Sequence, residues 1–425
     1  MRILVVSHNV FSNTTNMGKT LLGYFRNWEQ DEIAQLYVHS EVPVSDICTN
    51  YYRITDKEAA VSIFSRKCGG RFGKDDIQEN RLTPRTDTGI LASIYRYAQR
   101  RTPFVYFMRN IIWKMSAWNS PNLKAWLDDF TPEAVFFASG DYAFLYNVAL
   151  DIAQTRNIPL FTVCTDDYYL NNTNNRTVCG KLLHKRFMKS VSRTITYSSA
   201  LFTICDKMAA DYSKAFGKKC VVLHTPSSFE NTLNVKKAPR ISYLGNLMPN
   251  REESLVRIGR TLKELDLADG PKHIDVYSSE NRTNVTDMLV PENGIIFHGQ
   301  VGAEDVRRII GESIAVIHTE AFDEDTKARV RYSVSAKIAD SLASGTCLIV
   351  YAPGDIASVE YLKKNGAAFI ISDKDDLKKQ LKLILEDSER RERISANGRQ
   401  LARQNHGVCS AGNVIRSVIG DYVHN

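Results

Sequence analysis

Four charged residues in the second half of the chain have the types and spacing of an anion-binding site. Arg251 opens a helical stretch soon after the glycine turn at Gly245, and Glu320 follows a short apolar run. Lys337 and Asp340 are three residues apart, so a helix would present both on one face. Cations near helix starts bind phosphate oxygens well, because the side-chain charge and the helix dipole act together. These residues therefore predict a site for a diphosphate.

The segment from Ser335 to Gly345 is the expected helix of this site. Ser335 can cap its start and Gly345 can end it. Asp340, one turn further in, is placed to accept hydrogen bonds from ribose hydroxyls. Glu360 is a second candidate for the ribose. The alternatives are an exposed Lys–Asp pair and an exposed helix carboxylate.

A second glycine turn, at Gly299, follows another apolar run, Ile295–Phe297. Exposed backbone groups at such a turn can pair with the edge of a nucleotide base. The signal is weak by itself, as is that of Gly245, because glycine turns end many strands.

In the first half, polar side chains follow the expected strands. They are His8, Asn9, Asp141, Asp166 and Asp167. A carboxylate here, with Asp141 and Asp167 as the catalytic candidates, could orient or deprotonate an acceptor hydroxyl. Each of these acids could equally cap a helix or lie in a solvated loop.

The stretch 13–20 (NTTNMGKT) approaches a phosphate-binding P-loop but has Asn13 where that motif needs glycine. We therefore expect no ATP- or GTP-hydrolysing site. A polar loop is expected instead, in which Gly18 lets a ligand approach closely; a surface turn is the alternative.

Short apolar runs alternate with amphipathic stretches, which is the pattern of parallel α/β sheets. The strands expected in the first half are Ile3–Val6, Ala134–Ala138, Leu160–Cys164 and Leu201–Ile204. Those expected in the second half are Ile241–Leu244, His273–Tyr277, Ile295–Phe297, Ile314–Ile317, Cys347–Val350 and Phe369–Ile371. Helices are expected over 206–216, 252–265, 303–311, 335–344, 356–364, 374–386 and 388–404. Ligands bind beyond the carboxyl ends of such strands, where the candidate residues lie.

The polar stretch 224–239, bracketed by prolines, is the best candidate for a linker. It separates two α/β domains, 1–223 and 240–404, which would leave a cleft between them. The tail 405–425 is a candidate to cross back to the first domain.

Composition excludes several classes of protein. With 425 residues, 43% hydrophobic and 24% charged, the chain is long enough for two domains and unlike a disordered one. No apolar run approaches the about 18 residues of a membrane span, and the N-terminal run is too short for a signal peptide. The chain is therefore expected in the cytoplasm. The eight scattered cysteines favour neither zinc binding nor disulfides.

The region 313–362 resembles the donor-binding signature of the large retaining GT-B glycosyltransferase family, the Glu-x7-Glu type. Residues 332–345 (YSVSAKIADSLASG) are more similar to the variant found in bacterial capsule and exopolysaccharide enzymes. The resemblance extends over 245–402 and, more loosely, over the first half. It implies two Rossmann-like domains whose parallel sheets face a central cleft, the acceptor bound by residues 1–223 and a nucleotide-sugar by 240–404.

Carried over residue by residue, the resemblance implies that different residues bind different parts of the donor. Glu320 matches the glutamate that contacts the donor sugar, and Asp340 matches the residue that binds the ribose. Arg251 and Lys337 match cations on the diphosphate.

The chain also departs from the family pattern. Glu320 and Asp340 are twenty residues apart instead of about eight, so about twelve residues are inserted, including Arg329 and Arg331. The second acid is an aspartate, and Asn246 stands where the family has an arginine. The inserted residues 321–332 are the least predictable part of the site.

The charge is unevenly divided. Residues 1–238 contain 30 Lys and Arg against 21 Asp and Glu, and the rest contain 25 against 27. Residues 92–118 have five basic residues, seven aromatics and no acid, and 176–193 have six Lys or Arg and no acid. This pattern favours peripheral contact with an anionic membrane, the alternative being inward aromatics with solvated cations. No nucleic-acid-binding module is recognisable.

The function expected from these features is transfer of a hexosyl unit from a nucleotide-sugar to a saccharide or lipid-linked saccharide, in surface polysaccharide synthesis. The resemblance implies a UDP-sugar donor and retention of anomeric configuration. It also implies no metal, since no Asp-x-Asp motif sits where it would clamp the diphosphate, and no cofactor, since the nucleotide-sugar is a substrate. The alternatives are a GT-B nucleotide-sugar epimerase, which would form product without acceptor, and a non-catalytic partner that binds a sugar nucleotide.

Overall fold

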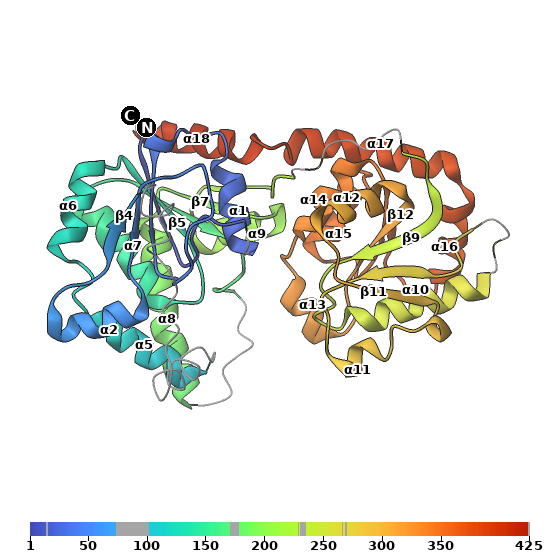
Figure 1. The fold of residues 1–425 in the computed structure, drawn as a ribbon, viewed down its shortest axis with the longest axis horizontal. Helices are drawn as coiled ribbons and strands as arrows, with labels where there is room; N and C mark the ends of the chain where they lie inside the picture. Colours follow the sequence, from blue (N-terminus) through green and yellow to red (C-terminus); the bar gives the residue numbers. More distant parts are fainter. Residues whose placement is uncertain are drawn as a thin grey trace. The chain divides into compact units, whose positions relative to one another are not determined.

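The computed structural model describes residues 1–13, 16–73, 102–170, 178–227, 229, 235–265, 267 and 270–423. They fall into two compact units. The first comprises Met1–Ile204, Met208–Leu223 and Ala411–Asn425, and the second comprises Cys205–Lys207 and His224–Ser410. Each unit has one sheet covered by helices (Figure 1). The prediction of an α/β fold with two parallel sheets is therefore confirmed.

The sheet of the first unit has eight strands in the order β4-β3-β2-β1-β5-β6-β7-β8. All neighbours pair in parallel except β3 and β4. The strands are β1 (Ile3–Ser7), β2 (Ile33–Tyr37), β3 (Tyr51–Arg53), β4 (Gly70–Phe72), β5 (Ala134–Ala138), β6 (Leu160–Cys164), β7 (Ala200–Thr203) and β8 (Cys220–Val222). The four strands expected in this half are present, each within one residue at either end.

Central strand β1 is buried along its whole length. Ile3 and Val5 share a core with helices α1 (Asn16–Phe25) and α18 (Ser410–Val423). Burial on both faces explains why this strand is a continuous apolar run instead of an alternating one. Helix α18 is also held by Arg416, which donates two hydrogen bonds to Glu32 in this unit.

The other helices of the first unit are α2 (Asp56–Ser65), α5 (Pro103–Met115), α6 (Pro121–Phe130), α7 (Ala143–Arg156), α8 (Val178–Tyr197) and α9 (Asp206–Phe216). Helices α5, α7 and α8 pack against one another, and α2 packs against α5. The expectation that Gly18 lies in a polar loop is wrong: it is a buried residue in the first turn of α1.

The sheet of the second unit has six parallel strands in the order β11-β10-β9-β12-β13-β14. They are β9 (Ala238–Leu244), β10 (Ile274–Tyr277), β11 (Ile295–Gly299), β12 (Ser313–Thr319), β13 (Cys347–Tyr351) and β14 (Phe369–Ile371). All six were expected, and β9 begins three residues earlier than predicted, inside the stretch proposed as a linker.

Alternation along the central strands builds two cores, one on each face of this sheet. Ala315 and Ile317 of β12 belong to one core, and Val316 belongs to the other. Because successive side chains of a strand point to opposite faces, one short run supplies both cores.

The helices of the second unit are α10 (Arg251–Leu265), α11 (Thr283–Thr286), α12 (Ala303–Glu312), α13 (Glu324–Val330), α14 (Ala336–Ser344), α15 (Ala357–Lys364), α16 (Leu377–Glu386) and α17 (Ser388–Asn405); short 3-10 turns are η1 (Gln30–Glu32) in the first unit and η2 (Pro291–Asn293) here. Helix α13 lies within the stretch recognised as an insertion. Across the described ranges, no helix combines the length and apolarity needed to cross a bilayer.

Candidate donor-binding site

The carboxyl ends of β9 and β12 bring together the main residues of the predicted site. These strands are parallel neighbours in the second sheet. Gly245 follows directly after β9, and Glu320 follows directly after β12. Arg251 is the first residue of α10, a few residues beyond Gly245. Residues distant in sequence thus converge at the sheet edge where ligands of α/β folds bind.

Arg251 and Glu320 form a two-pronged ion pair. Nε of Arg251 donates to Oε2 of Glu320 at 2.8 Å, and Nη2 donates to Oε1 at 2.6 Å. Both side chains are largely buried, with 14% of the arginine and 3% of the glutamate exposed. The third arginine nitrogen, Nη1, donates to the backbone oxygen of Asn246. The pair fixes the plane of the carboxylate at the strand end.

The backbone of Glu320 is also held. Its N–H donates to the carbonyl of Tyr351 on β13, and its carbonyl accepts from the hydroxyl of Ser254 on α10. Hydroxyl and amide groups of neighbouring elements therefore position the residue independently of Arg251.

Lys337 reaches the same place from α14. A Cβ added to Gly245 would overlap Nζ of Lys337, and Gly245 has a φ of +148°, so both space and backbone conformation require glycine here. Desolvation, and then the charge of Arg251, lower the pKa of Lys337 to about 8. In the part of the chain that the structure describes, its ammonium makes no hydrogen bond or ion pair, so its donors are available to a ligand.

His318 was not predicted as a site residue. It precedes Glu320 by two positions, so its side chain lies on the same face of β12. Its Nε2 is 3.7 Å from Oε1 of Glu320, and this buried atom has no hydrogen-bond partner among the described residues. Burial, followed by the charges of Arg251 and Lys337, lowers its pKa to about 3, so the ring is neutral at physiological pH. The period-two spacing to Glu320 was the available signal.

Helix α14 begins where expected. Ser335 is its N-cap residue, but the Ser335 hydroxyl makes no capping hydrogen bond, contrary to the expectation. Gly345 ends the helix in the left-handed conformation, as predicted. The N–H groups at the start of this helix form a favourable site for an anion beside Lys337.

The two ribose candidates have protein partners in this structure. Oδ1 of Asp340 accepts a hydrogen bond from the hydroxyl of Ser227 at 2.7 Å. Glu360, in the first turn of α15, is 46% exposed and forms an ion pair with Lys207 at 2.6 Å. Ribose binding by either residue stays a prediction.

The inserted residues form a small structured unit of their own. Asp323 caps α13 by accepting from the N–H of Thr326, and Lys327 pairs with Asp355 at 3.0 Å. The guanidinium of Arg331 lies over the ring of Tyr332.

The turns after β9 and β11 have separate features. The side chain of Asn246 accepts a hydrogen bond from the N–H of Met248, and thus shapes the turn after β9. At the end of β11, Gly299 has a φ of +73° and open space beside it.

In the first unit, His8 is held in a tight cluster after β1. Its ring stacks on Tyr142 at 4.6 Å, and Nη2 of Arg109 lies 3.5 Å from Nε2 of His8. Arginine can only donate, so Nε2 accepts and Nδ1 carries the proton toward the side chain of Asn9. Burial and then Arg109 lower the pKa of His8 to about 4. Arg109 itself is ion-paired with Asp56 at 2.8 Å.

The three candidate acids of this unit differ in their contacts. Asp141 accepts from the hydroxyl of Tyr106 at 2.6 Å. Oδ1 of Asp167 accepts from the N–H groups of Tyr169 and Leu170 and from the hydroxyl of Tyr212, so this carboxylate organises its own loop. Desolvation and then the neighbouring charge of Asp141 raise the pKa of Asp166, opposed by a hydrogen bond from Tyr168.

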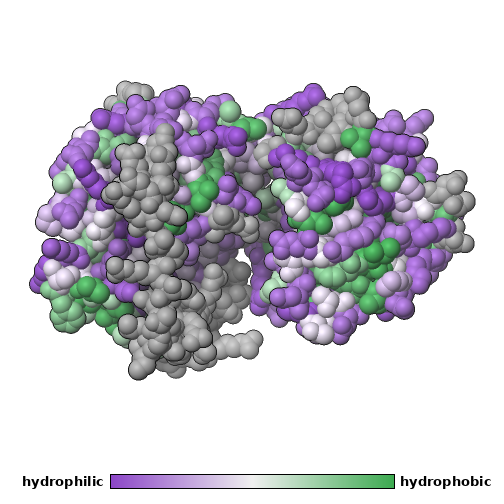
Figure 2. All heavy atoms as spheres, viewed as in Figure 1, coloured by the Kyte–Doolittle hydropathy of each residue, from purple (hydrophilic) through white to green (hydrophobic). Residues whose placement is uncertain are grey.

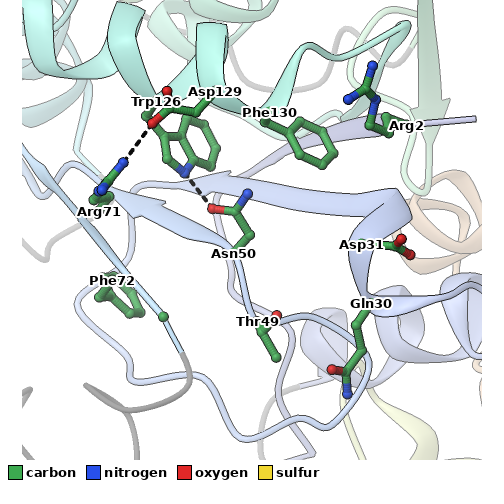
Figure 3. Close-up of a pocket in the computed structure, with 11 residues that line it drawn as sticks. Arg2, Gln30, Asp31, Thr49, Asn50, Arg71, Phe72, Trp126, Asp129 and Phe130 are labelled. Atoms are coloured by element: carbon green, nitrogen blue, oxygen red, sulfur yellow. Dashed lines mark hydrogen bonds and ion pairs between the residues drawn. The ribbon is translucent and has the colours of Figure 1, made fainter.

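A cavity of about 710 Å³ in the first unit lies at the other edge of the sheet (Figure 3). Arg2, Asp31 and Asn50 line it, and each precedes a strand, whereas the acceptor candidates follow strands. Trp126 donates to Asn50 at 2.6 Å across its wall. The predicted acceptor residues therefore do not line this cavity.

Comparison with known proteins agrees with this architecture. Residues 256–409 match a family model described as glycosyl transferase-like. HepE of Anabaena, solved in complex with UDP, is 10% identical with a TM-score of 0.58 over 99% of this chain and 100% of its own. Sucrose-phosphate synthase of Thermosynechococcus elongatus is 9% identical with a TM-score of 0.58 over 99% and 100%. TarM is 9% identical with a TM-score of 0.62 over 98% of both chains.

No curated protein shows a significant sequence match to the chain. The solved structures share its fold along almost its whole length, with two parallel-sheet domains. The family model covers most of the unit that holds Glu320 and Lys337, and it begins after Arg251. The chain thus shares the fold of these solved structures, and part of its second unit is similar to a glycosyl transferase-like family.

Proposed function

We propose that the protein transfers a hexosyl unit from a UDP-sugar to a saccharide or lipid-linked saccharide acceptor in surface polysaccharide synthesis. The observation that carries this proposal is the convergence of Arg251, Lys337 and Glu320 at the carboxyl ends of β9 and β12. Two cations beside one carboxylate and a helix N-terminus suit a diphosphate attached to a sugar. HepE, with the same fold, has also been solved with UDP-glucose.

In this proposal, Arg251, Lys337 and the N-terminus of α14 bind the diphosphate. When the bond between the anomeric carbon and the diphosphate oxygen breaks, negative charge grows on the leaving group. Fixed cations in a poorly solvated site stabilise that charge without reorganisation, so they replace the role a metal ion would have. Glu320 contacts the donor sugar, and Asp340 or Glu360 binds the ribose.

The acceptor would be bound by the first unit. Asp141 and Asp166 follow β5 and β6, two adjacent parallel strands, so both lie at the carboxyl edge of the sheet. The raised pKa of Asp166 is a property that suits proton exchange with a hydroxyl. In this proposal these acids orient or deprotonate the acceptor hydroxyl.

We also propose peripheral contact of the first unit with an anionic membrane. Large apolar side chains are exposed on the packed helices α2 and α5: Phe64 is 90% exposed, Val61 55%, Phe104 58% and Met115 58%. Figure 2 shows an apolar surface over the position of α2 in Figure 1. Helix α8, which packs on α5, has five basic residues between 181 and 193 and no acid. Residues 92–101 and 176–177 lie outside the described residues.

The nucleotide specificity is tested by a thermal-shift screen. Ligands that bind only the folded state increase its free energy of unfolding and therefore raise the unfolding temperature. At a ligand concentration a hundred times the dissociation constant, the increase in free energy is about 2.7 kcal/mol. We expect UDP and one or more UDP-hexoses to raise the Tm, with AMP and ATP as controls that do not. A UDP-hexose that is turned over only when a saccharide acceptor is added would support a transferase over an epimerase or a non-catalytic partner. An unchanged Tm with every nucleotide-sugar would contradict the proposal.

A further inference from the structure

In this structure the carboxylate oxygens of Glu320 are not available to accept hydrogen bonds from a sugar. Both oxygens accept hydrogen bonds from Arg251, and only 3% of the side chain is exposed. The same guanidinium is the diphosphate ligand of the proposed function, on which the present inference rests. A bound diphosphate would therefore compete with Glu320 for Arg251.

If Arg251 turns toward a diphosphate, Glu320 loses two charge-assisted hydrogen bonds. A largely buried carboxylate without partners is unfavourable and has no fixed orientation. The backbone contacts to Tyr351 and Ser254 hold the main chain of Glu320 but not its carboxylate. Another donor is needed to keep the side chain aimed at the sugar.

His318 is placed to be that donor. Its Nε2 lies 3.7 Å from Oε1, the oxygen that Nη2 of Arg251 engages, and has no other partner among the residues that the structure describes. This nitrogen is itself buried, so bulk solvent does not reach it. Hydrogen-bonding distance is about 2.9 Å, so a movement of less than about 1 Å closes the gap.

The chemistry of a neutral imidazole suits this task. With its proton on Nε2, the ring donates to a carboxylate without adding a charge that would itself compete for the diphosphate. The low pKa of His318 keeps the ring in this neutral form throughout the physiological range.

We infer that His318 is a positioning residue: when the donor diphosphate takes Arg251, Nε2–H of His318 donates to Oε1 of Glu320 and holds that carboxylate toward the donor sugar. Lys337 stays on the diphosphate, because no other described group competes for its ammonium. The pair Arg251–Glu320 is then the resting arrangement, and His318–Glu320 the donor-bound one.

Two substitutions separate this role from simple packing. His318→Phe keeps an aromatic ring but removes the donor. His318→Gln places an amide nitrogen close to the position of Nε2 and restores a neutral donor. Thermal unfolding shows whether either variant is folded, and UDP affinity by calorimetry shows whether Glu320 keeps a donor when the diphosphate occupies Arg251.

The experiment measures UDP affinity and steady-state release of UDP from the UDP-hexose that gives the largest thermal shift. For His318→Phe we expect UDP to bind roughly tenfold more weakly, because Glu320 then has no donor when Arg251 turns to the diphosphate, and kcat to fall at least tenfold; each is the effect of one lost hydrogen bond to an ion. His318→Gln should recover both UDP affinity and kcat to within about threefold. The inference is overturned if His318→Phe keeps its kcat, or if His318→Gln is as slow as His318→Phe while both variants are folded. Absence of UDP binding by the wild-type protein would instead contradict the proposed function.

Discussion

The guanidinium of Arg251 donates a hydrogen bond to each carboxylate oxygen of Glu320, and so connects the start of α10 to the end of β12. The pair lies beside the ammonium of Lys337, which makes no contact of its own with a described carboxylate. One carboxylate is thus surrounded by two cations, which leaves a local excess of positive charge. That excess lies at the ligand-binding edge of a parallel sheet, where it suits an anionic ligand.

Removing Arg251 should destabilise the second unit. Arg251→Ala removes the cation paired with the buried Glu320 and leaves neutral His318 as the nearest donor; losing one partner of a buried ion pair typically costs about 3–5 kcal/mol. At about 2–4 °C per kcal/mol for a domain of this size, the Tm should fall by at least about 6 °C. The double variant Arg251→Ala/Glu320→Gln removes that stranded charge and should recover part of the loss in the same differential scanning calorimetry. A double variant no more stable than the single one would show that the charge is not the cause.

UDP affinity should depend on pH through Lys337. Its pKa of about 8 means that the ammonium is charged below pH 8 and neutral above it. Since the charged form binds an anion, affinity should fall as pH rises from 7 to about 9.5, at most tenfold per pH unit. Calorimetric titrations across this range measure the effect. Lys337→Arg, which stays charged throughout, should abolish the dependence; an equally steep profile in that variant would assign it elsewhere.

Gly245→Ala should weaken UDP binding at least tenfold with the fold retained. The added methyl group overlaps the ammonium of Lys337 and faces an unfavourable φ, so the lysine must move away. Gly302→Ala is a matched control in the same unit, because its nearest side-chain atom lies 3.9 Å from an added Cβ. If both variants bind UDP like wild type, Lys337 does not need its present position.

The ion pair between Arg416 and Glu32 should contribute to stability in a pH-dependent manner. Hydrogen bonds from Arg416 lower the pKa of Glu32 to about 2. Because the pKa of Glu32 is lower in the folded protein than in the unfolded chain, where it is about 4.5, the ion pair stabilises the fold at pH values above about 4.5. This stabilisation is lost as the pH falls toward 2. Arg416→Ala should therefore lower the Tm at pH 7 but change it little near pH 2. Equal losses at both pH values would point to packing on Trp28, which Arg416 also covers at 4.1 Å.

Binding to anionic vesicles should need both the apolar and the basic surface of the first unit. Co-sedimentation with phosphatidylglycerol-containing vesicles is expected at low salt and should weaken as salt rises. Phe64→Ser should reduce it several-fold, whereas Leu383→Ser, an exposed apolar residue of the second unit, should not. Lack of binding at low salt ends the membrane proposal.

Much of the fold could be predicted because its strands are short apolar runs bounded by polar residues. Ala134–Ala138 and Phe369–Ile371 were predicted to the residue for this reason. Strand β2 was missed because Gln35 interrupts its apolar run; in the structure this side chain donates to Ser7 and is fully buried. Helix α7 was missed because its own apolar residues lie on all of its faces, so its sequence shows no amphipathic period.

The site was predictable in part, because charged residues after strands converge at one sheet edge. Arg251, Glu320 and Lys337 could be grouped in this way. The period-two spacing of His318 to Glu320 indicates a shared strand face, but it does not reveal that the ring is buried and neutral or that Nε2 lacks a hydrogen-bond partner among the described residues. Likewise the hydrogen bond from Tyr212 to Asp167 could not be predicted, because the two residues are far apart in sequence.

The most direct test of the central claim is calorimetric titration of UDP into the wild-type protein and into Lys337→Ala. The matched control is Lys382→Ala, which removes an exposed cation of the same unit that pairs with Glu386. The account predicts that wild type and Lys382→Ala bind UDP equally and that Lys337→Ala binds at least tenfold more weakly, in line with the loss of a charge-assisted contact to phosphate. Unchanged UDP affinity in Lys337→Ala would contradict the assignment of this site to the donor diphosphate.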